Sequence, residues 1–131
     1  MRIPKNITIA KIAELLANRE ISSVEVCSQF IENYRKENPE INALLVLDED
    51  KIMSHASESD RRRKEGRALS PYDGIPLVVK DNICVEGEPC SCASKILEGF
   101  VSPYDATVIK RIKSAGMIPF GILQPLAAIR L

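Results

Sequence analysis

Two short apolar runs with an amphipathic helix between them constrain the fold of this chain more than any other feature. The first run is Leu77–Val79 and the second spans residues 117–121. Between them, residues 105–115 repeat apolar side chains at helical spacing. Those side chains are Val108, Ile109, Ile112 and Ala115. A strand, a helix and a strand in this order predict an α/β fold with a largely parallel sheet.

Local signals predict where these elements begin and end. Asp105 is expected to cap the N-terminus of the helix, and Gly116 is expected to end it. Residues 66–74 are rich in Gly, Ser, Pro and Asp, which predicts a loop before the first strand. A short helix is predicted at residues 94–100, after a cysteine-rich loop.

The N-terminal residues predict a helical hairpin with a short connection. The first helix is expected to begin at Thr8 and to end within residues 18–20, because apolar residues at helical spacing form one stripe. That stripe consists of Ile9, Ile12, Ala13 and Leu16. Ser22 followed by Glu25 is the pattern of a capping box, which starts the second helix.

The second helix is expected to bury one face and to end at Pro39, because proline disrupts a helix interior. Its expected buried residues are Val24, Cys27, Ile31 and Tyr34. Residues 43–47 then form a short apolar run, which predicts a buried strand. Residues 48–67 predict a polar helix that packs along a narrow apolar edge. Its basic run at residues 61–64 is interpreted as a solvated face, with an RNA-phosphate contact as the alternative.

Composition limits the function classes. The chain has 131 residues, which fits one domain or a piece of one. Apolar residues make up 45% and charged residues 27%, as in an ordinary globular protein, and the net charge is zero. A neutral chain gives no support for a broad basic surface that binds nucleic acid. Neither a signal sequence nor a membrane-spanning run is recognisable, so we expect a cytoplasmic protein without membrane contact.

Four cysteines could suggest a metal site or a disulfide. Cys84, Cys90 and Cys92 lie close together in sequence, and Cys27 lies apart from them. Their spacing lacks the two-residue gap of common zinc sites, and His55 is the only histidine. No metal site is therefore predicted, and the cysteines are interpreted as ordinary thiols.

Lys80 is the candidate catalytic residue. It ends the apolar run Leu77–Val79 and is followed by Asp81 and Asn82. Functional residues of α/β sheets gather at the carboxyl ends of strands, and a lysine without its proton can act as a general base. Composition alone favours the ordinary alternative, a solvated lysine at a strand end.

Three segments resemble the amidase-signature family of enzymes. Residues 72–82, Tyr-Asp-Gly-Ile-Pro-Leu-Val-Val-Lys-Asp-Asn, resemble the lysine-bearing segment of that family. Residues 92–98 and 102–108 are similar to one branch, the A subunits of tRNA-dependent glutamyl and aspartyl amidotransferases. The resemblance covers residues 7–121 and implies the N-terminal portion of an amidase fold. This portion is the helical hairpin, followed by strands of a mixed sheet with flanking helices.

The resemblance also implies a mechanism. Lys80 matches the lysine of a Ser–cis-Ser–Lys triad, in which the neutral amine takes a proton from the middle serine. That serine activates a nucleophilic serine, which attacks the side-chain amide of glutamine and releases ammonia. The implied partners are a B subunit, which uses ATP and Mg2+ to convert Glu-tRNA(Gln) to Gln-tRNA(Gln), and a C subunit, together forming a heterotrimer. No cofactor is expected on this chain itself.

The sequence departs from the family pattern in two respects. Both triad serines belong to a Gly/Ser-rich segment, and no serine here is flanked by glycine. The match stops after Gly121, so we divide the chain into residues 1–121, part of an amidase domain, and a divergent tail, residues 122–131. A shifted reading frame or a rearranged gene would explain this tail. We therefore expect a truncated chain that is inactive alone. The alternatives are a fragment of a general amidase or a non-catalytic module that binds a partner subunit.

Overall fold

The computed structural model describes residues 2–92 and 94–123. The elements are α1 (Ile9–Ala17), α2 (Ser23–Ile41), β1 (Leu44–Val46), α3 (Glu49–Lys64), β2 (Pro76–Lys80), the 3-10 helix η1 (Lys95–Leu97), α4 (Thr107–Ser114) and β3 (Ile118–Leu123). They form a three-layer α/β arrangement, which confirms the predicted fold class. Within the described residues, no helix has both the length and the apolar character needed to cross a membrane.

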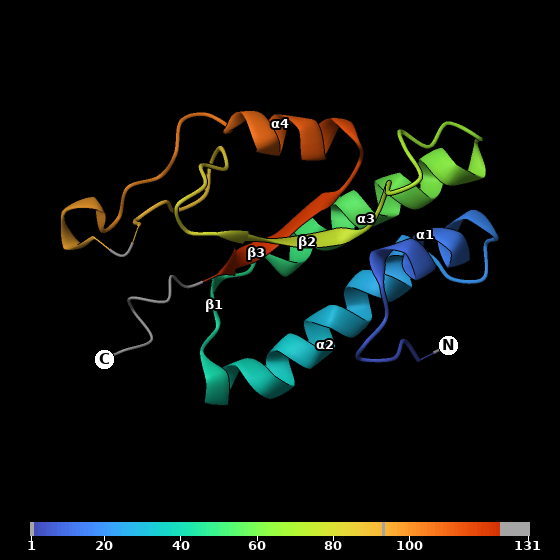
Figure 1. Ribbon diagram of the computed structural model, residues 1–131, viewed down its shortest axis with the longest axis horizontal. Helices are drawn as coiled ribbons and strands as arrows, with labels where there is room; N and C mark the ends of the chain where they lie inside the picture. Colours follow the sequence, from blue (N-terminus) through green and yellow to red (C-terminus); the bar gives the residue numbers. More distant parts are fainter. Residues whose placement is uncertain (1, 93, 124–131) are drawn as a thin grey trace.

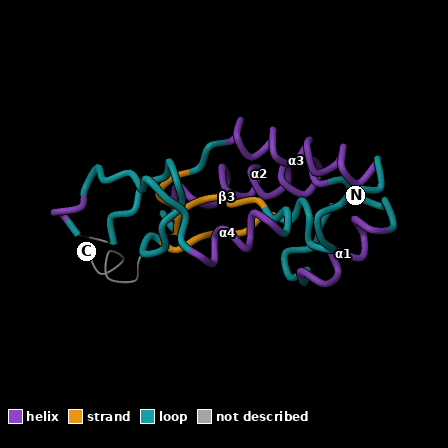
Figure 2. The backbone as a smooth tube through the Cα atoms, turned by 90° about the horizontal axis from the view of Figure 1, so that it is seen from above, coloured by secondary structure: helices purple, strands orange, loops and turns teal. Residues whose placement is uncertain are grey.

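The sheet is small and mixed. Its strand order is β1-β3-β2, with β2 parallel and β1 antiparallel to the central β3. Helix α4 covers one face, and α2 and α3 cover the other (Figures 1 and 2). Both views place α1 and η1 at opposite ends of the molecule. The predicted strand–helix–strand unit is therefore β2, α4 and β3.

The strand predicted at residues 43–47 exists, but the expectation that it is buried is wrong. Strand β1 pairs only with β3 among the described strands, so it lies at an edge. Leu45 is 44% exposed, and its two neighbours in the strand are half-buried. A run of apolar residues resembles a central strand even when only one side of it meets the core.

A register shift in β3 distributes its side chains between the two faces. Leu77 pairs with Pro119 but Val78 pairs with Gly121, so β3 has an extra residue at this point. Ile118, before the shift, and Phe120, the extra residue, pack with α2 and α3. After it, Ile122 packs on the opposite side with Val79 and Ile109 of α4. One strand thus supplies buried residues to two separate hydrophobic clusters.

The first helix begins and ends as predicted, but its apolar stripe is shifted. Thr8 caps α1 by accepting a hydrogen bond from the Lys11 amide at 3.2 Å. The buried residues are Ile12, Leu15 and Leu16. Ile9 was expected on this face but is 47% exposed, because it lies in the first turn beyond the packed cluster.

The capping box of α2 is confirmed, and the end predicted for this helix is wrong. Ser22 and Glu25 exchange hydrogen bonds between side chain and backbone at 2.7 and 3.1 Å. Pro39 lies inside the last turn, where the loss of a single amide donor is tolerated. The helix continues to Ile41 and ends at Asn42, whose φ of 47° is left-handed.

Removing the capping hydroxyl is expected to destabilise the protein. We expect Ser22→Ala to lower the free energy of unfolding by about 1 kcal/mol, because an amide at the start of α2 loses its acceptor. The control is Ser54→Ala on α3, an exposed serine with no side-chain hydrogen bond within the described residues. Urea unfolding measures both. Equal midpoints for the two variants would contradict the capping role.

Helix α4 lacks the predicted N-cap. Its N-cap residue is Ala106, which makes no side-chain hydrogen bond. Asp105 instead accepts hydrogen bonds from the Glu86 amide at 2.7 Å and from the Lys113 amine at 2.9 and 3.0 Å. It therefore joins α4 to the cysteine-rich loop. Gly116 follows the helix at a φ of 81°, as its predicted role requires.

Candidate active site

Lys80 is the last residue of β2, as the sequence predicts. It pairs with Leu123, the last residue of the parallel strand β3. Its side chain is exposed, and no described residue forms an ion pair or a side-chain hydrogen bond with it. The residue therefore lies at the carboxyl edge of the sheet, where functional groups of α/β proteins gather.

Asp81 fixes the corner that follows Lys80. Its amide donates to the Leu123 carbonyl at 3.1 Å, and its side chain is 1% exposed. The buried carboxylate accepts hydrogen bonds from the amide of Ser91, at 2.9 Å, and from the Ser91 hydroxyl. The loop after β2 is thus folded back onto the strand end. Sequence analysis did not assign this role, because the partner lies ten residues away.

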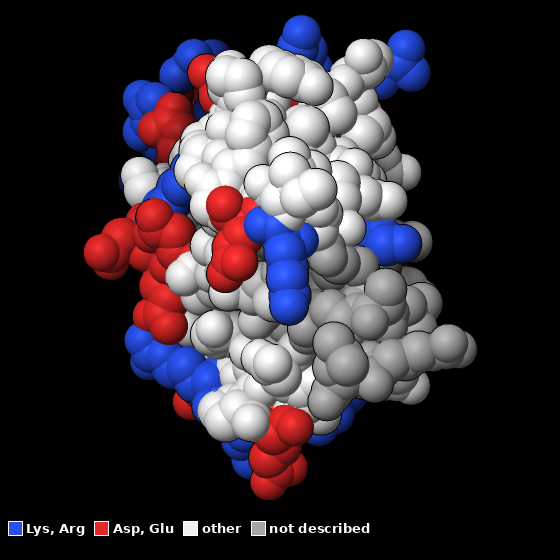
Figure 3. All heavy atoms as spheres, turned by 90° about the vertical axis from the view of Figure 1, so that its left-hand side faces the viewer, with Lys and Arg blue, Asp and Glu red and all other residues white. Residues whose placement is uncertain are grey.

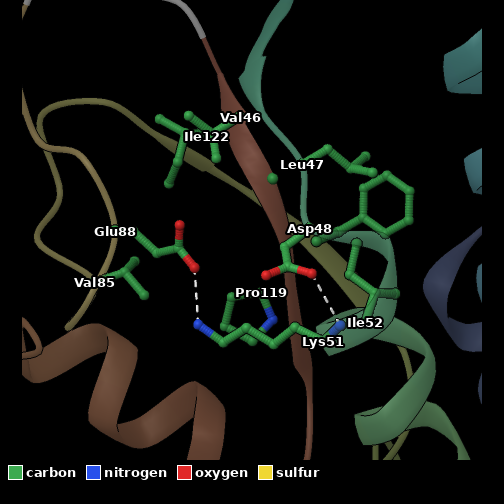
Figure 4. Close-up of a pocket in the computed structure, with 11 residues that line it drawn as sticks. Val46, Leu47, Asp48, Lys51, Ile52, Val85, Glu88, Pro119 and Ile122 are labelled. Atoms are coloured by element: carbon green, nitrogen blue, oxygen red, sulfur yellow. Dashed lines mark hydrogen bonds and ion pairs between the residues drawn. The ribbon is translucent and has the colours of Figure 1, made fainter.

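The same loop is tied to both helical layers. Lys51 of α3 reaches Glu88 in an ion pair of 2.8 Å (Figure 4). Figure 4 shows this contact beside a small pocket lined by apolar side chains that include Val85 and Ile122. On the other layer, Asp105 holds the Glu86 amide, as described above. Contacts with α3 and α4 therefore position the loop that follows Lys80.

The η1 end of the molecule exposes several apolar side chains. Figure 3, which views this end, shows uncharged side chains over much of the surface, with acidic and basic side chains near its centre and along its margins. The exposed apolar residues of this segment are Ile96, Leu97, Phe100, Val101 and Tyr104.

A buried ion pair holds the loop that precedes β2. Asp73 has no exposed side-chain surface, and its carboxylate accepts from Arg62 through two nitrogens at 2.6 and 2.9 Å. The Leu69 amide donates to the same carboxylate at 2.9 Å. Arg63 donates to the Asp73 carbonyl at 2.7 Å. The interpretation of residues 61–64 as a solvated face is therefore wrong for Arg62 and Arg63, because both bind this loop.

Two glycines allow close packing around this loop, Gly116 against Asp73 and Gly74 against two serines. A Cβ on Gly116 would lie 2.4 Å from a carboxylate oxygen of Asp73. A Cβ on Gly74 would lie 2.3 Å from the Ser59 hydroxyl, and Gly74 has a φ of 87°. The Gly74 carbonyl accepts from the Ser23 hydroxyl at 2.6 Å. Asp73 and Gly74, in the segment of residues 72–82, thus pack α2 and α3 against the start of β2.

Electrostatics at Asp73 favour the charged carboxylate. Burial acts to raise the pKa of Asp73, but the hydrogen bonds from Arg62 and the Leu69 amide outweigh it and lower that pKa below its ordinary value. The buried carboxylate is therefore ionised at neutral pH. It serves the fold rather than proton transfer, because its oxygens are already engaged.

The cysteines have distinct environments. Cys27 is fully buried, and burial raises the pKa of its thiol to about 12. Cys84 and Cys90 lie with their sulfurs 3.6 Å apart, and Cys92 is exposed. Across residues 2–92 and 94–123, no group of three or more His, Cys, Asp or Glu side chains could hold a metal ion.

A family model and several relatives match the chain. The amidase family model matches residues 25–124. The A subunit of the glutamyl-tRNA(Gln) amidotransferase of Leptospira interrogans is 44% identical over 110 residues, which are 84% of this chain and 23% of that protein. Its counterpart in Nitrosomonas europaea is 40% identical over 116 residues, 88% of this chain and 24% of that protein.

Solved structures give the same result. The native peptide amidase of Stenotrophomonas maltophilia superposes with a TM-score of 0.82 at 28% identity, covering 91% of this chain and 25% of that chain. A vestigial protein complex that reveals the evolutionary origins of an s-triazine catabolic enzyme gives a TM-score of 0.84 at 28% identity, covering 90% of this chain and 26% of that chain. The chain thus spans about a quarter of the length of its relatives. The family model covers most of the sequence, and the chain belongs to the amidase family.

Proposed function

We propose that this chain is part of the glutamine-hydrolysing A subunit of a tRNA-dependent amidotransferase. The observation that carries the proposal is the 44% identity to such a protein over 110 residues. Any continuous match of that length within 131 residues includes Lys80 and the segment around it. The identity to the peptide amidase is lower, at 28%.

In this proposal, Lys80 is the general base of a Ser–cis-Ser–Lys triad whose two serines lie outside these 131 residues. Neutral Lys80 accepts a proton from the middle serine, which in turn deprotonates the nucleophile that attacks the glutamine amide. Ammonia leaves and passes to a B subunit, which uses ATP and Mg2+ to amidate Glu-tRNA(Gln). A C subunit completes the heterotrimer. The complex acts in the cytoplasm, in protein biosynthesis.

The 131-residue polypeptide alone is proposed to be inactive. A base without its nucleophile cannot form an acyl-enzyme. The second candidate is a general amidase that acts on small amides, and the superposition on peptide amidase supports it. The two candidates differ in whether glutamine hydrolysis depends on tRNA and on partner subunits.

The test is ammonia release by the intact A subunit that contains this chain, assembled with its B and C subunits. We expect hydrolysis of glutamine that increases with Glu-tRNA(Gln) and ATP, and little hydrolysis of propionamide. The polypeptide of residues 1–131 serves as the control and should release none. Efficient hydrolysis of propionamide, without any effect of tRNA, would favour the general amidase.

A further inference from the structure

The loop after β2 brings two thiols into contact. The sulfurs of Cys84 and Cys90 are 3.6 Å apart. We propose that these two cysteines form a reversible disulfide when the protein meets a peroxide, which makes this loop a site of oxidative modification. The inference rests on the geometry of the loop and is independent of the proposed amidotransferase function.

Backbone hydrogen bonds fix the part of the loop that carries Cys90. The Cys90 amide donates to the Phe100 carbonyl at 3.1 Å, and the Ser102 amide donates to the Glu88 carbonyl at 3.0 Å. Between the cysteines, Gly87 adopts a φ of 80°, which lets the chain turn. The sulfurs must approach from 3.6 Å to the bonded distance of about 2.05 Å.

The two thiols have complementary reactivity. The pKa of Cys84 is lowered by its polar neighbours, first the Ser102 hydroxyl and then the Cys90 sulfur. Cys84 is also half-buried rather than enclosed, so a small oxidant can reach it. Burial raises the pKa of Cys90 to about 12. The more acidic Cys84 is therefore the attacking thiolate, and Cys90 is the resolving thiol.

The chemistry proceeds in two balanced steps. The Cys84 thiolate attacks hydrogen peroxide, the O–O bond breaks, and the products are Cys84 sulfenic acid and hydroxide. The Cys90 sulfur then attacks the Cys84 sulfur, and the S–O bond breaks. The hydroxyl group leaves as water with the proton of the Cys90 thiol. Each pair of thiols gives up two electrons, and one peroxide is reduced to two waters.

Oxidation changes the corner next to Lys80. In the reduced state, the Cys90 thiol donates to the carbonyl of Asp81 at 3.3 Å. The disulfide has no S–H group, so this hydrogen bond is lost while a covalent link closes residues 84–90. Because Asp81 also holds Ser91, the oxidised loop is anchored differently at the residue that follows Lys80.

The test maps the linkage in the purified full-length protein. Protein is treated with hydrogen peroxide, its remaining thiols are blocked with N-ethylmaleimide, and it is cleaved by a Glu-specific protease. Cleavage after Glu86 separates Cys84 from Cys90. Trypsin is unsuitable, because residues 81–95 contain no internal Lys or Arg. We expect two peptides joined by a disulfide, which dithiothreitol releases.

Two variants assign the bond. Cys92→Ser should keep the linkage, because exposed Cys92 is not the proposed partner. Cys84→Ser should abolish the disulfide. Buried Cys90 is unchanged in this variant, so we expect the fold to be preserved. A thermal melt checks this expectation. Fully buried Cys27 should remain unmodified throughout. The proposal is overturned if Cys84 oxidises without linking to Cys90, or if the linkage disappears in Cys92→Ser.

Discussion

Arg62→Ala is expected to lower the free energy of unfolding by about 3 to 5 kcal/mol, the usual cost of removing one partner of a buried ion pair. The pair is well formed, since Arg62 donates two hydrogen bonds to a carboxylate with no exposed surface. Without Arg62, Asp73 keeps the Leu69 amide but has no opposing charge. The destabilisation therefore comes from an uncompensated buried charge.

Arg61 provides a matched control in the neighbouring position. Its side chain is 57% exposed, and it pairs with Glu58 one turn away on the surface of α3. Arg61→Ala should change stability by less than about 1 kcal/mol, because exposed pairs contribute little. Urea unfolding of both variants measures the difference. Similar midpoints for the two would show that the Arg62–Asp73 pair does not hold the loop.

The pH dependence gives an independent readout. The folded-state pKa of Asp73 lies below its ordinary value of 3.8, so its contribution to stability is complete above pH 3.8. That contribution is lost as the pH falls through the folded-state pKa. Arg62→Ala removes the largest factor that lowers this pKa, so acid unfolding should begin at a higher pH than in the unaltered protein.

The double variant Arg62→Ala/Asp73→Ala tests whether the two effects are coupled. If the residues act as a pair, the double variant should be more stable than the sum of the two single changes predicts, by about 0.5 to 3 kcal/mol. Additive losses would show that each residue acts through other contacts. The Arg63 bond to the Asp73 carbonyl remains in every variant, so the loop keeps one attachment.

Sequence patterns predicted those elements whose signals are local. The capping box of Ser22 and Glu25 and the apolar run Leu77–Val79 depend on residues within a few positions, and both were found as predicted. Pro39 was expected to end α2 but lies in its last turn, where proline is tolerated. Asp105 was expected to cap α4 but binds the distant Glu86 amide instead. Leu45 is exposed because β1 pairs with one strand only. A single apolar run does not show how many strands will pair with it.

The candidate site shows the same division. The strand-end position of Lys80 follows from the sequence, whereas its surroundings depend on contacts across the fold. Asp81 meets Ser91 only because the loop folds back, and Arg62 meets Asp73 only because α3 lies beside the loop before β2. Charge runs and isolated acidic residues carry no signal of such pairings.

Lys80→Met is expected to reduce glutamine hydrolysis by the intact complex by about 100- to 10,000-fold, the usual contribution of a general base. Folding should be nearly unaffected, because the Lys80 side chain is exposed and makes no ion pair with a described residue. Loss of activity with an unchanged urea midpoint would thus be a chemical effect. Lys110→Met, another exposed lysine without an ion pair in the described chain, is the control and should retain activity.

Lys80→Arg separates two roles for the same residue. Arginine keeps the positive charge but does not give up its proton in proteins, so it cannot accept one from a serine. If Lys80 is the base, Lys80→Arg should be as inactive as Lys80→Met. If the residue only supplies positive charge, Lys80→Arg should keep much of the activity. Full activity in Lys80→Met would remove Lys80 from the catalytic group and leave it as a solvated residue at the end of β2.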